Sequence, residues 1–336
     1  MKKLLYIGNK LSAHGLNKTT IETLGPLLEQ EGYNIAYASS QKMLLFRLVD
    51  MLWAVICQRK ADYVLIDTYS TSSFWYAFAT GQLCRLFKIP YIPILHGGNL
   101  PNRLVRNPLF CQMLFGNAYQ NVAPSPYLLE AFKNKGYTNL VFIPNILQIE
   151  DYPFKDRQVI QPKLLWVRAF ASIYNPKMAV DVLRELQKKY DGASLCMVGP
   201  DKDGSLAITQ EYAVEIGVKH ITFTGKLSKK EWITLSEEYD VFINTTHFDN
   251  TPVSIMEAMA LGMPIVSTSV GGIPFLLKDT EEALLTKDSD AHAMTEAVIR
   301  LVEDFELNKK IISNARAKAR RWDWTIVKKE WGVLLK

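Results

Sequence analysis

The chain has 336 residues, of which 48% are hydrophobic and 22% are charged. At about 150 residues per domain this length predicts two domains, and the balanced composition excludes a disordered or fibrous chain. The four cysteines lie far apart and form no Cys-x-x-Cys pair. That spacing argues against a disulfide framework or a structural zinc site and favours a reducing compartment.

The net charge of +5 is unevenly distributed, because residues 1–150 hold 14 Lys and Arg against 8 Asp and Glu, and the remainder holds 25 against 26. A basic first half suits a phosphate-bearing ligand or an acidic membrane surface, although scattered solubilising charge explains it equally well. The first apolar run is too short for a signal peptide, and no stretch approaches the ~20 apolar residues of a spanning helix. We therefore expect a cytoplasmic location, with peripheral attachment to the inner face of the membrane as the alternative.

Residues 1–150 alternate short β-type runs with helical segments. Strands are predicted at 4–7, 34–38, 63–66, 91–95, 121–123 and 140–143, and helices at 19–30, 43–59, 72–87 and 127–135. Such alternation indicates parallel βαβ units. The polar stretch 145–162 contains three prolines and no periodicity, so it is predicted to be a linker.

The same rhythm restarts over residues 163–321. Strands are predicted at 163–168, 194–198, 220–223, 240–244 and 265–267, with a short one at 284–285. Helices are predicted from 175–176, from 228 to about 239, at 253–261, 290–304 and 307–320, and over 322–335. The fold class is therefore α/β, with two doubly wound Rossmann-like domains, 1–150 and 163–321. Open parallel sheets bind ligands beyond the carboxyl ends of their strands, so two facing sheets predict a cleft that holds the chemistry.

The segment 246–264 follows a predicted strand and enters a short helix. The N-terminus of that helix offers free N–H groups and a partial positive charge, which suit a diphosphate. Glu257 lies one helical turn after Val253, where a carboxylate can accept hydrogen bonds from both hydroxyls of a ribose. Asp249, on the loop before the helix, can reach a sugar hydroxyl. From the pattern alone, a turn residue and a solvated helix residue explain these two acids as well.

Residues 249–274 resemble the signature of family 4 of the retaining GT-B glycosyltransferases, the glycosyl transferases group 1. That signature is an acid and a Glu eight residues apart, then Ala-Met-Ala-x-Gly-x-Pro-Val-Val-x-x-x-x-Gly-Gly. Here Asp249 and Glu257 precede AMALGMPIV at 258–266, and a Gly pair follows at 271–272. The resemblance implies a GT-B fold and sugar transfer from a nucleoside-diphosphate sugar, UDP or GDP, with retention at the anomeric carbon. It implies that Glu257 binds the donor ribose and that Asp249 contacts the donor sugar.

The resemblance also implies that backbone amides at Thr251, Val253 and Ser254 hold the sugar and the diphosphate. Two departures stand beside it. The first acid is usually Glu, and Pro252 occupies a position that is usually Gly. Proline has no N–H, so one donor amide is absent.

Arg168 ends the first strand of the second half, where the family places an arginine against the donor diphosphate. A guanidinium suits bidentate phosphate binding and neutralises the leaving group. The family usually adds a lysine five or six residues later. Lys177 is a candidate with the wrong spacing, and Lys226 is its rival. By the same resemblance Gly199 and the loop at 225–227 cradle the nucleotide.

In the first half, Gly15 resembles the family's glycine loop near the diphosphate and the acceptor. His96, in His-Gly-Gly after a predicted strand, resembles the family histidine that contacts the donor sugar; an anchor for its loop is the plainer alternative. The helix at about 322–336 resembles the family's C-terminal helix that crosses back onto the first domain. No metal or other cofactor is expected, because Arg168 and the helix N-terminus supply positive charge. The Asp201-Lys202-Asp203 run is interpreted as a turn.

The acceptor is expected to be a glycan or a lipid-linked sugar, as in surface polysaccharide or glycoconjugate synthesis, with no nucleic-acid partner. The helix predicted at 43–57 and the run 74–78 are more apolar than a helix with one solvated face requires. Membrane contact explains this, and so does core packing or a dimer face. Two other functions stay open: a GT-B nucleotide-sugar epimerase, and a nucleotide-sugar-binding protein without catalysis.

Overall fold

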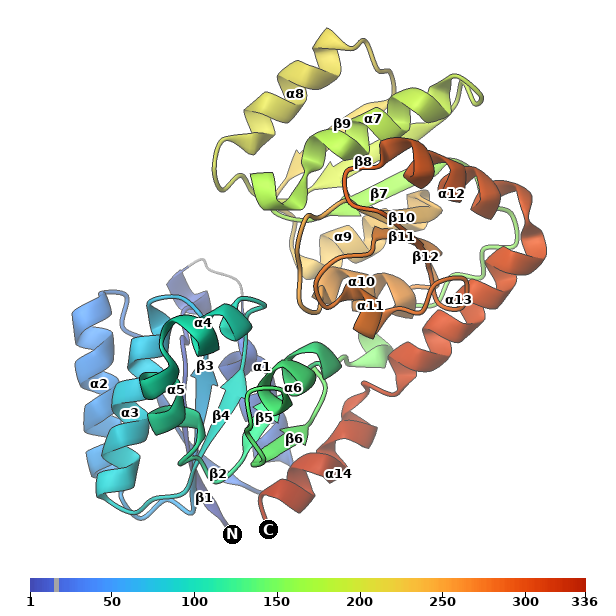
Figure 1. Cartoon of the computed structure of the whole chain (residues 1–336). Helices are drawn as coiled ribbons and strands as arrows, with labels where there is room; N and C mark the ends of the chain where they lie inside the picture. The colour runs from blue at the N-terminus through green and yellow to red at the C-terminus, as the bar shows by residue number, and fades with distance from the viewer. Residues whose placement is uncertain (15–17) are drawn as a thin grey trace. The chain divides into compact units, whose positions relative to one another are not determined.

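The computed structural model describes residues 1–14 and 18–336, which form two compact units. Unit 1 comprises Met1–Ile146 and Trp324–Lys336, and unit 2 comprises Leu147–Asp323. Each unit is a six-stranded parallel sheet with helices packed on both of its faces (Figure 1). Within the described ranges no helix is both long enough and apolar enough to span a membrane.

The sheet of unit 1 has the strand order β2-β1-β3-β4-β5-β6. Its strands are β1 (Lys3–Ile7), β2 (Asn34–Ala38), β3 (Tyr63–Thr68), β4 (Tyr91–Leu95), β5 (Asn121–Ala123) and β6 (Leu140–Phe142). Its helices are α1 (Thr20–Gln30), α2 (Leu44–Cys57), α3 (Ser73–Leu86), α4 (Leu100–Arg106), α5 (Pro108–Phe115), α6 (Pro126–Lys133) and α14 (Trp324–Leu334), with a 3₁₀ turn η1 at Ser12–His14.

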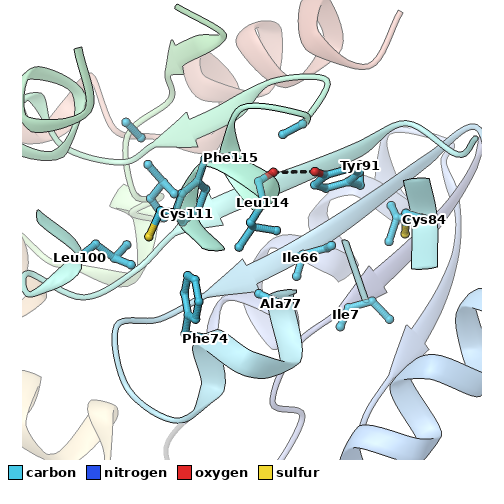
Figure 2. Close-up of a cluster of buried hydrophobic side chains, with 14 of the residues drawn as sticks. Ile7, Ile66, Phe74, Ala77, Cys84, Tyr91, Leu100, Cys111, Leu114 and Phe115 are labelled. Carbon is cyan, nitrogen blue, oxygen red and sulfur yellow. Dashed lines mark hydrogen bonds between the residues drawn. The ribbon is translucent and has the colours of Figure 1, made fainter. Parts of the chain in front are cut away.

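Strands β3 and β4 are buried along their whole length, as expected for parallel strands covered on both faces. One face packs against α2 to α6, and Figure 2 shows part of this core, including Phe74 on α3 and Phe115 on α5. There the Tyr91 hydroxyl donates to the carbonyl of Leu114 at 2.5 Å. The opposite face packs against α1 and α14, with Trp324 and Trp331 in its core.

The sheet of unit 2 has the order β12-β11-β10-β7-β8-β9. Its strands are β7 (Lys163–Val167), β8 (Ser194–Val198), β9 (Ile221–Gly225), β10 (Val241–Asn244), β11 (Ile265–Thr268) and β12 (Leu284–Thr286). Its helices are α7 (Pro176–Gln187), α8 (Ser205–Glu215), α9 (Lys229–Leu235), α10 (Val253–Ala260), α11 (Ile273–Leu276), α12 (Ala291–Glu303) and α13 (Phe305–Arg320), with 3₁₀ turns η2 (Ile149–Asp151), η3 (Ser172–Tyr174) and η4 (Ser236–Glu238). Helices α7, α8 and α12 pack on one face, and α9, α10 and the end of α13 pack on the other.

The segment 145–162, predicted to be a linker, contains the boundary between the two units, and its residues from Leu147 onward belong to unit 2. Tyr152 is 1% exposed and Arg157 is 3% exposed. The Arg157 guanidinium donates to the carbonyls of Ser236 and Leu261, both at 2.9 Å. These partners lie 79 and 104 residues away along the chain, so a local pattern of prolines and polar residues does not reveal them.

Candidate active site

The candidate site of unit 2 lies where its strand order reverses. After β7 the chain adds β8 and β9 on one side of the sheet and β10 to β12 on the other. The loops after β7 and β10 therefore emerge side by side at the carboxyl edge, which is where open α/β sheets bind ligands. The first loop carries Arg168, and the second carries Asp249 and leads into α10.

Arg168 lies in this edge with its charge already paired. Its Nη2 forms an ion pair with Oδ2 of Asp249, and its guanidinium carbon lies 4.6 Å from the centre of the Tyr174 ring. The Arg168 side chain is 14% exposed, and its buried Nε has no hydrogen-bond partner. Burial lowers the pKa of Arg168 to about 10, so the group is a cation at neutral pH. A buried cation with an unused donor is suited to an anionic ligand.

The loop that carries Tyr174 is fixed from β10. The Thr245 hydroxyl donates to the carbonyl of Tyr174 at 2.8 Å, and the His247 amide donates to that of Ile173 at 2.8 Å. Gly199 follows β8 and lies against the Arg168 backbone, because a Cβ at this position would overlap the Arg168 carbonyl oxygen. Gly199 thus permits the close approach of the Arg168 backbone, and its own amide donates to the carbonyl of Gly225 at 2.8 Å.

Helix α10 begins beside Asp249 and presents its positive end to the same edge. Pro252 is its N-cap, and the hydroxyls of Thr251 and Ser254 are buried without a hydrogen-bond partner. The first N–H groups of a helix also lack partners within the helix. Two unpartnered hydroxyls beside such N–H groups form a cluster of donors that suits phosphate or sugar oxygens.

The paired glycines after β11 hold the Asp249 loop in place. The Gly272 amide donates to the Asp249 carbonyl at 2.8 Å. A Cβ on Gly271 would overlap that same carbonyl oxygen, and one on Gly272 would overlap the carbonyl oxygen of Asn250. The Gly-Gly pair is therefore required by the close approach of two loops, which gives this part of the sequence signature a physical reason.

Glu257, one turn into α10, is 12% exposed at its side chain. Its Oε1 accepts a hydrogen bond of 2.6 Å from the Tyr152 hydroxyl and lies 3.7 Å from Nζ of Lys229. Burial raises the pKa of the Glu257 carboxyl above its ordinary value, and the Tyr152 bond and the Lys229 charge oppose that rise. Lys229 also lies 4.5 Å from the centre of the Tyr152 ring.

Sequence reasoning missed both Tyr152 and Lys229. Lys177 has its Nζ 4.9 Å from the centre of the Tyr212 ring on α8, and Lys226 is exposed on the loop after β9. The lysine that reaches Glu257 is Lys229. The signal for it was the capping box of Ser228 and Glu231, which fixes the start of α9 and so the position of the next residue.

Unit 1 has a second polar group at its own reversal point, between β1 and β3. Asp67, at the end of β3, has no exposed side-chain surface, and its Oδ1 accepts from the Tyr6 hydroxyl at 3.1 Å and contacts Nε2 of His96 at 2.9 Å. Its Oδ2 has no partner. The Tyr69 ring stacks on His96 at 5.0 Å between ring centres. Sequence reasoning missed Asp67, because it lies in a mostly apolar strand. Gly15, which was predicted to lie near the diphosphate, is outside the described residues.

Within residues 1–14 and 18–336, no group of three or more His, Cys, Asp or Glu side chains is arranged to hold a metal ion. The two aspartates of the Asp-Lys-Asp run bind local amides. Asp201 accepts from Gly204 at 3.2 Å, and Asp203 accepts from Ser172 at 2.9 Å. Hydrogen bonds from the Ser205 hydroxyl and from the Ser172 amide lower the pKa of Asp203 to about 2.

Known proteins with the same architecture are glycosyltransferases of the GT-B fold. The chain aligns along its full length with *Anabaena* Alr3699/HepE in complex with UDP-glucose, at 15% identity, 99% coverage of that chain and a TM-score of 0.77. Sucrose-phosphate synthase from *Thermosynechococcus elongatus* aligns over 99% of this chain and 98% of its own, at 16% identity and a TM-score of 0.79. The two units thus have the GT-B fold predicted from the sequence.

A family model described as "Glycosyl transferases group 1" matches residues 149–318, which all lie in unit 2. The chain belongs to this family. Among curated relatives, an uncharacterized glycosyltransferase of *Methanocaldococcus jannaschii* is 23% identical over 74% of this chain and 70% of its own. A phosphatidyl-myo-inositol mannosyltransferase of *Mycobacterium leprae* is 23% identical over 56% of this chain, and the match spans about half, 51%, of that relative.

Proposed function

We propose that the protein transfers a sugar from a nucleoside-diphosphate sugar, with UDP or GDP as the nucleotide, to a glycan or lipid-linked acceptor, with retention at the anomeric carbon. The observation that carries this proposal is the meeting of Arg168, Asp249 and the start of α10 at one sheet edge, with Glu257 one turn further along. Cation, helix N-terminus and carboxylate are the groups that a diphosphate and a ribose require.

In this proposal the diphosphate takes the place beside Arg168 and the N-terminus of α10. The unpartnered Arg168 Nε and the Ser254 hydroxyl support it, because both are buried donors that the protein itself leaves unsatisfied. The charge that develops on the departing diphosphate is then neutralised by groups already in position. Removing one such donor costs about 10²–10³ in rate in other enzymes.

The two acids receive different tasks. Glu257 accepts hydrogen bonds from the ribose hydroxyls, which requires its ionised form. Tyr152 and Lys229 both favour that ionised form. Asp249 contacts the transferred sugar from the loop that the glycine pair fixes. His96 is assigned to the donor sugar, with Asp67 orienting its ring, and acceptor binding is assigned to unit 1.

Retention is proposed to arise from attack on the same face from which the diphosphate departs. The acceptor oxygen forms the new bond to the anomeric carbon while the bond to the diphosphate oxygen breaks. The acceptor proton passes to the departing phosphate oxygen, so no protein base and no metal ion is required. The charge of Arg168 makes that oxygen a better leaving group, and positioning supplies the rest of the catalysis.

The test is incubation with UDP- and GDP-sugars and with glycan and lipid-linked acceptors, followed by NMR of the anomeric proton of the product. A new glycosidic bond of the same anomeric configuration as the donor supports the proposal. Interconversion of the nucleotide-sugar without an acceptor would identify an epimerase, and tight binding without any turnover would identify a binding protein. A product of inverted configuration would contradict retention but would leave the proposal of sugar transfer standing.

A further inference from the structure

Helix α2 of unit 1 turns an apolar face outward. Its buried side holds Met51 and Val55, together with Arg47, whose guanidinium bonds the 41–42 backbone and Asn9. The opposite side of the helix carries Leu45, which is 69% exposed, and Trp53, which is 62% exposed. Surface helices normally carry polar residues on the side that faces solvent. An exposed apolar side such as this one indicates a surface that binds a partner.

The apolar face continues across the neighbouring helices. Helix α3 packs beside α2, and α5 packs beside α3, on the same face of the unit 1 sheet (Figure 1). Trp75 of α3 meets Phe110 of α5 edge to face at 5.2 Å, and both rings remain about 40% exposed. Leu109, at 77% exposure, extends the surface further. The apolar face is defined here by Leu45, Val49, Trp53, Trp75, Leu109 and Phe110.

Charge around the apolar face is mostly positive. Lys42 precedes α2, Arg59 and Lys60 follow it, and Arg106 ends α4, three residues before Leu109 in the sequence; all four are exposed. Residues 68–129, which include α3, α4 and α5, contain no Asp or Glu at all, and α2 contains one, Asp50. An apolar surface bordered by cations complements a surface that is apolar inside and anionic at its rim.

We propose that the apolar face docks unit 1 on an anionic lipid bilayer, with Trp53, Trp75 and Leu109 entering the interfacial region and the four cations meeting lipid phosphates. A second copy of the chain fits less well. In a symmetric dimer each face meets itself, so the cations of both copies would be brought together with few acids to balance them. The proposal does not rest on sugar transfer, since a protein without enzymatic activity would dock in the same way.

The test is co-flotation of the full chain with vesicles of pure phosphatidylcholine and with vesicles that also contain phosphatidylglycerol. We expect binding to the anionic vesicles, weakened when salt screens the cations. Trp53→Glu and Leu45→Glu should each lower the apparent affinity about tenfold or more, because each replaces a large apolar contact with a charge. Val214→Glu is the matched control, since Val214 is 82% exposed on α8 of unit 2 and should be neutral.

Light scattering of the same proteins in solution distinguishes docking on a bilayer from dimerisation with a second copy of the chain. A monomer that floats with anionic vesicles, and loses this with Trp53→Glu but not with Val214→Glu, supports the proposal. The proposal is overturned if the wild type binds neither vesicle at low salt, or if Trp53→Glu binds as the wild type does. A dimer that Trp53→Glu dissociates, without vesicle binding, overturns it in favour of a second copy. Far-UV circular dichroism checks that each variant is folded.

Discussion

The bond between Tyr152 and Glu257 gives a prediction about pH. Tyr152→Phe keeps the ring and removes the hydroxyl that donates to Glu257 Oε1 at 2.6 Å. Hydrogen bonds to charged groups contribute about 1.5–3 kcal/mol, which corresponds to about 1–2 pH units in the pKa of the acceptor. Lys229 remains at 3.7 Å, but its side chain is half exposed, so solvent screens its charge and it replaces little of the lost bond.

The sign follows from which form of the carboxyl the bond favours. Tyr152 stabilises the ionised form, and its loss adds to the effect of burial, which already raises the pKa of Glu257. In Tyr152→Phe the carboxyl therefore stays protonated up to a higher pH. Under the proposed function, nucleotide affinity depends on the ionised form, so its decline on acidification should begin about one pH unit higher in the variant.

Two measurements examine this prediction separately. A ¹³C NMR titration of the glutamate carboxyl carbons, with Glu257→Gln to assign the signal, reports the pKa without reference to function. Calorimetric titration with UDP and GDP across the acidic range reports the affinity. Tyr212→Phe is the control, because it removes a similar bond of 2.7 Å to Asp181 on α7. Coincident carboxyl titrations in Tyr152→Phe and wild type would refute the reasoning from the structure.

Two further predictions concern backbone and burial. Gly199→Ala should displace Arg168 and reduce nucleoside-diphosphate affinity at least about tenfold, which is the effect of losing one charge-assisted bond. Gly192→Ala is the control, because its Cβ meets open space, and it should leave the calorimetric affinity unchanged. Asp67→Ala, which removes the fully buried carboxylate that contacts His96, should lower the free energy of urea unfolding by about 3 kcal/mol. Asp288→Ala breaks a pair of similar length that is 38% exposed on both sides and should cost less than about 1 kcal/mol, so equal losses would contradict the role given to burial.

The sequence predicted the strands more completely than the helices. Buried parallel strands appear as short apolar runs, and β2, β4, β5 and β8 begin and end where the pattern places them. Helices α4, α5, α8 and α11 were not predicted, and α4 and α5 carry Pro101 and Pro108 at their starts. In the structure each proline occupies the first turn of its helix, where its missing N–H costs nothing.

For the candidate site, the sequence identified the groups that follow strands but not those that support them. Arg168 and Asp249 come from strand ends, which a local pattern reveals, although their ion pair does not follow from it. Tyr152 reaches Glu257 across more than a hundred residues, and Asp67 reaches His96 across 29. Such partners are fixed by the topology of the sheets, so no local spacing predicts them.

The central claim is that Arg168 binds the diphosphate of a nucleotide donor together with the start of α10. Its most direct test is calorimetric titration of the wild type and of Arg168→Ala with UDP and GDP and with their sugars. The account predicts that at least one of these nucleotides binds the wild type and that the variant binds it about 10- to 100-fold more weakly. Equal affinity in a folded Arg168→Ala variant, or no binding of any of them to the wild type, would contradict it.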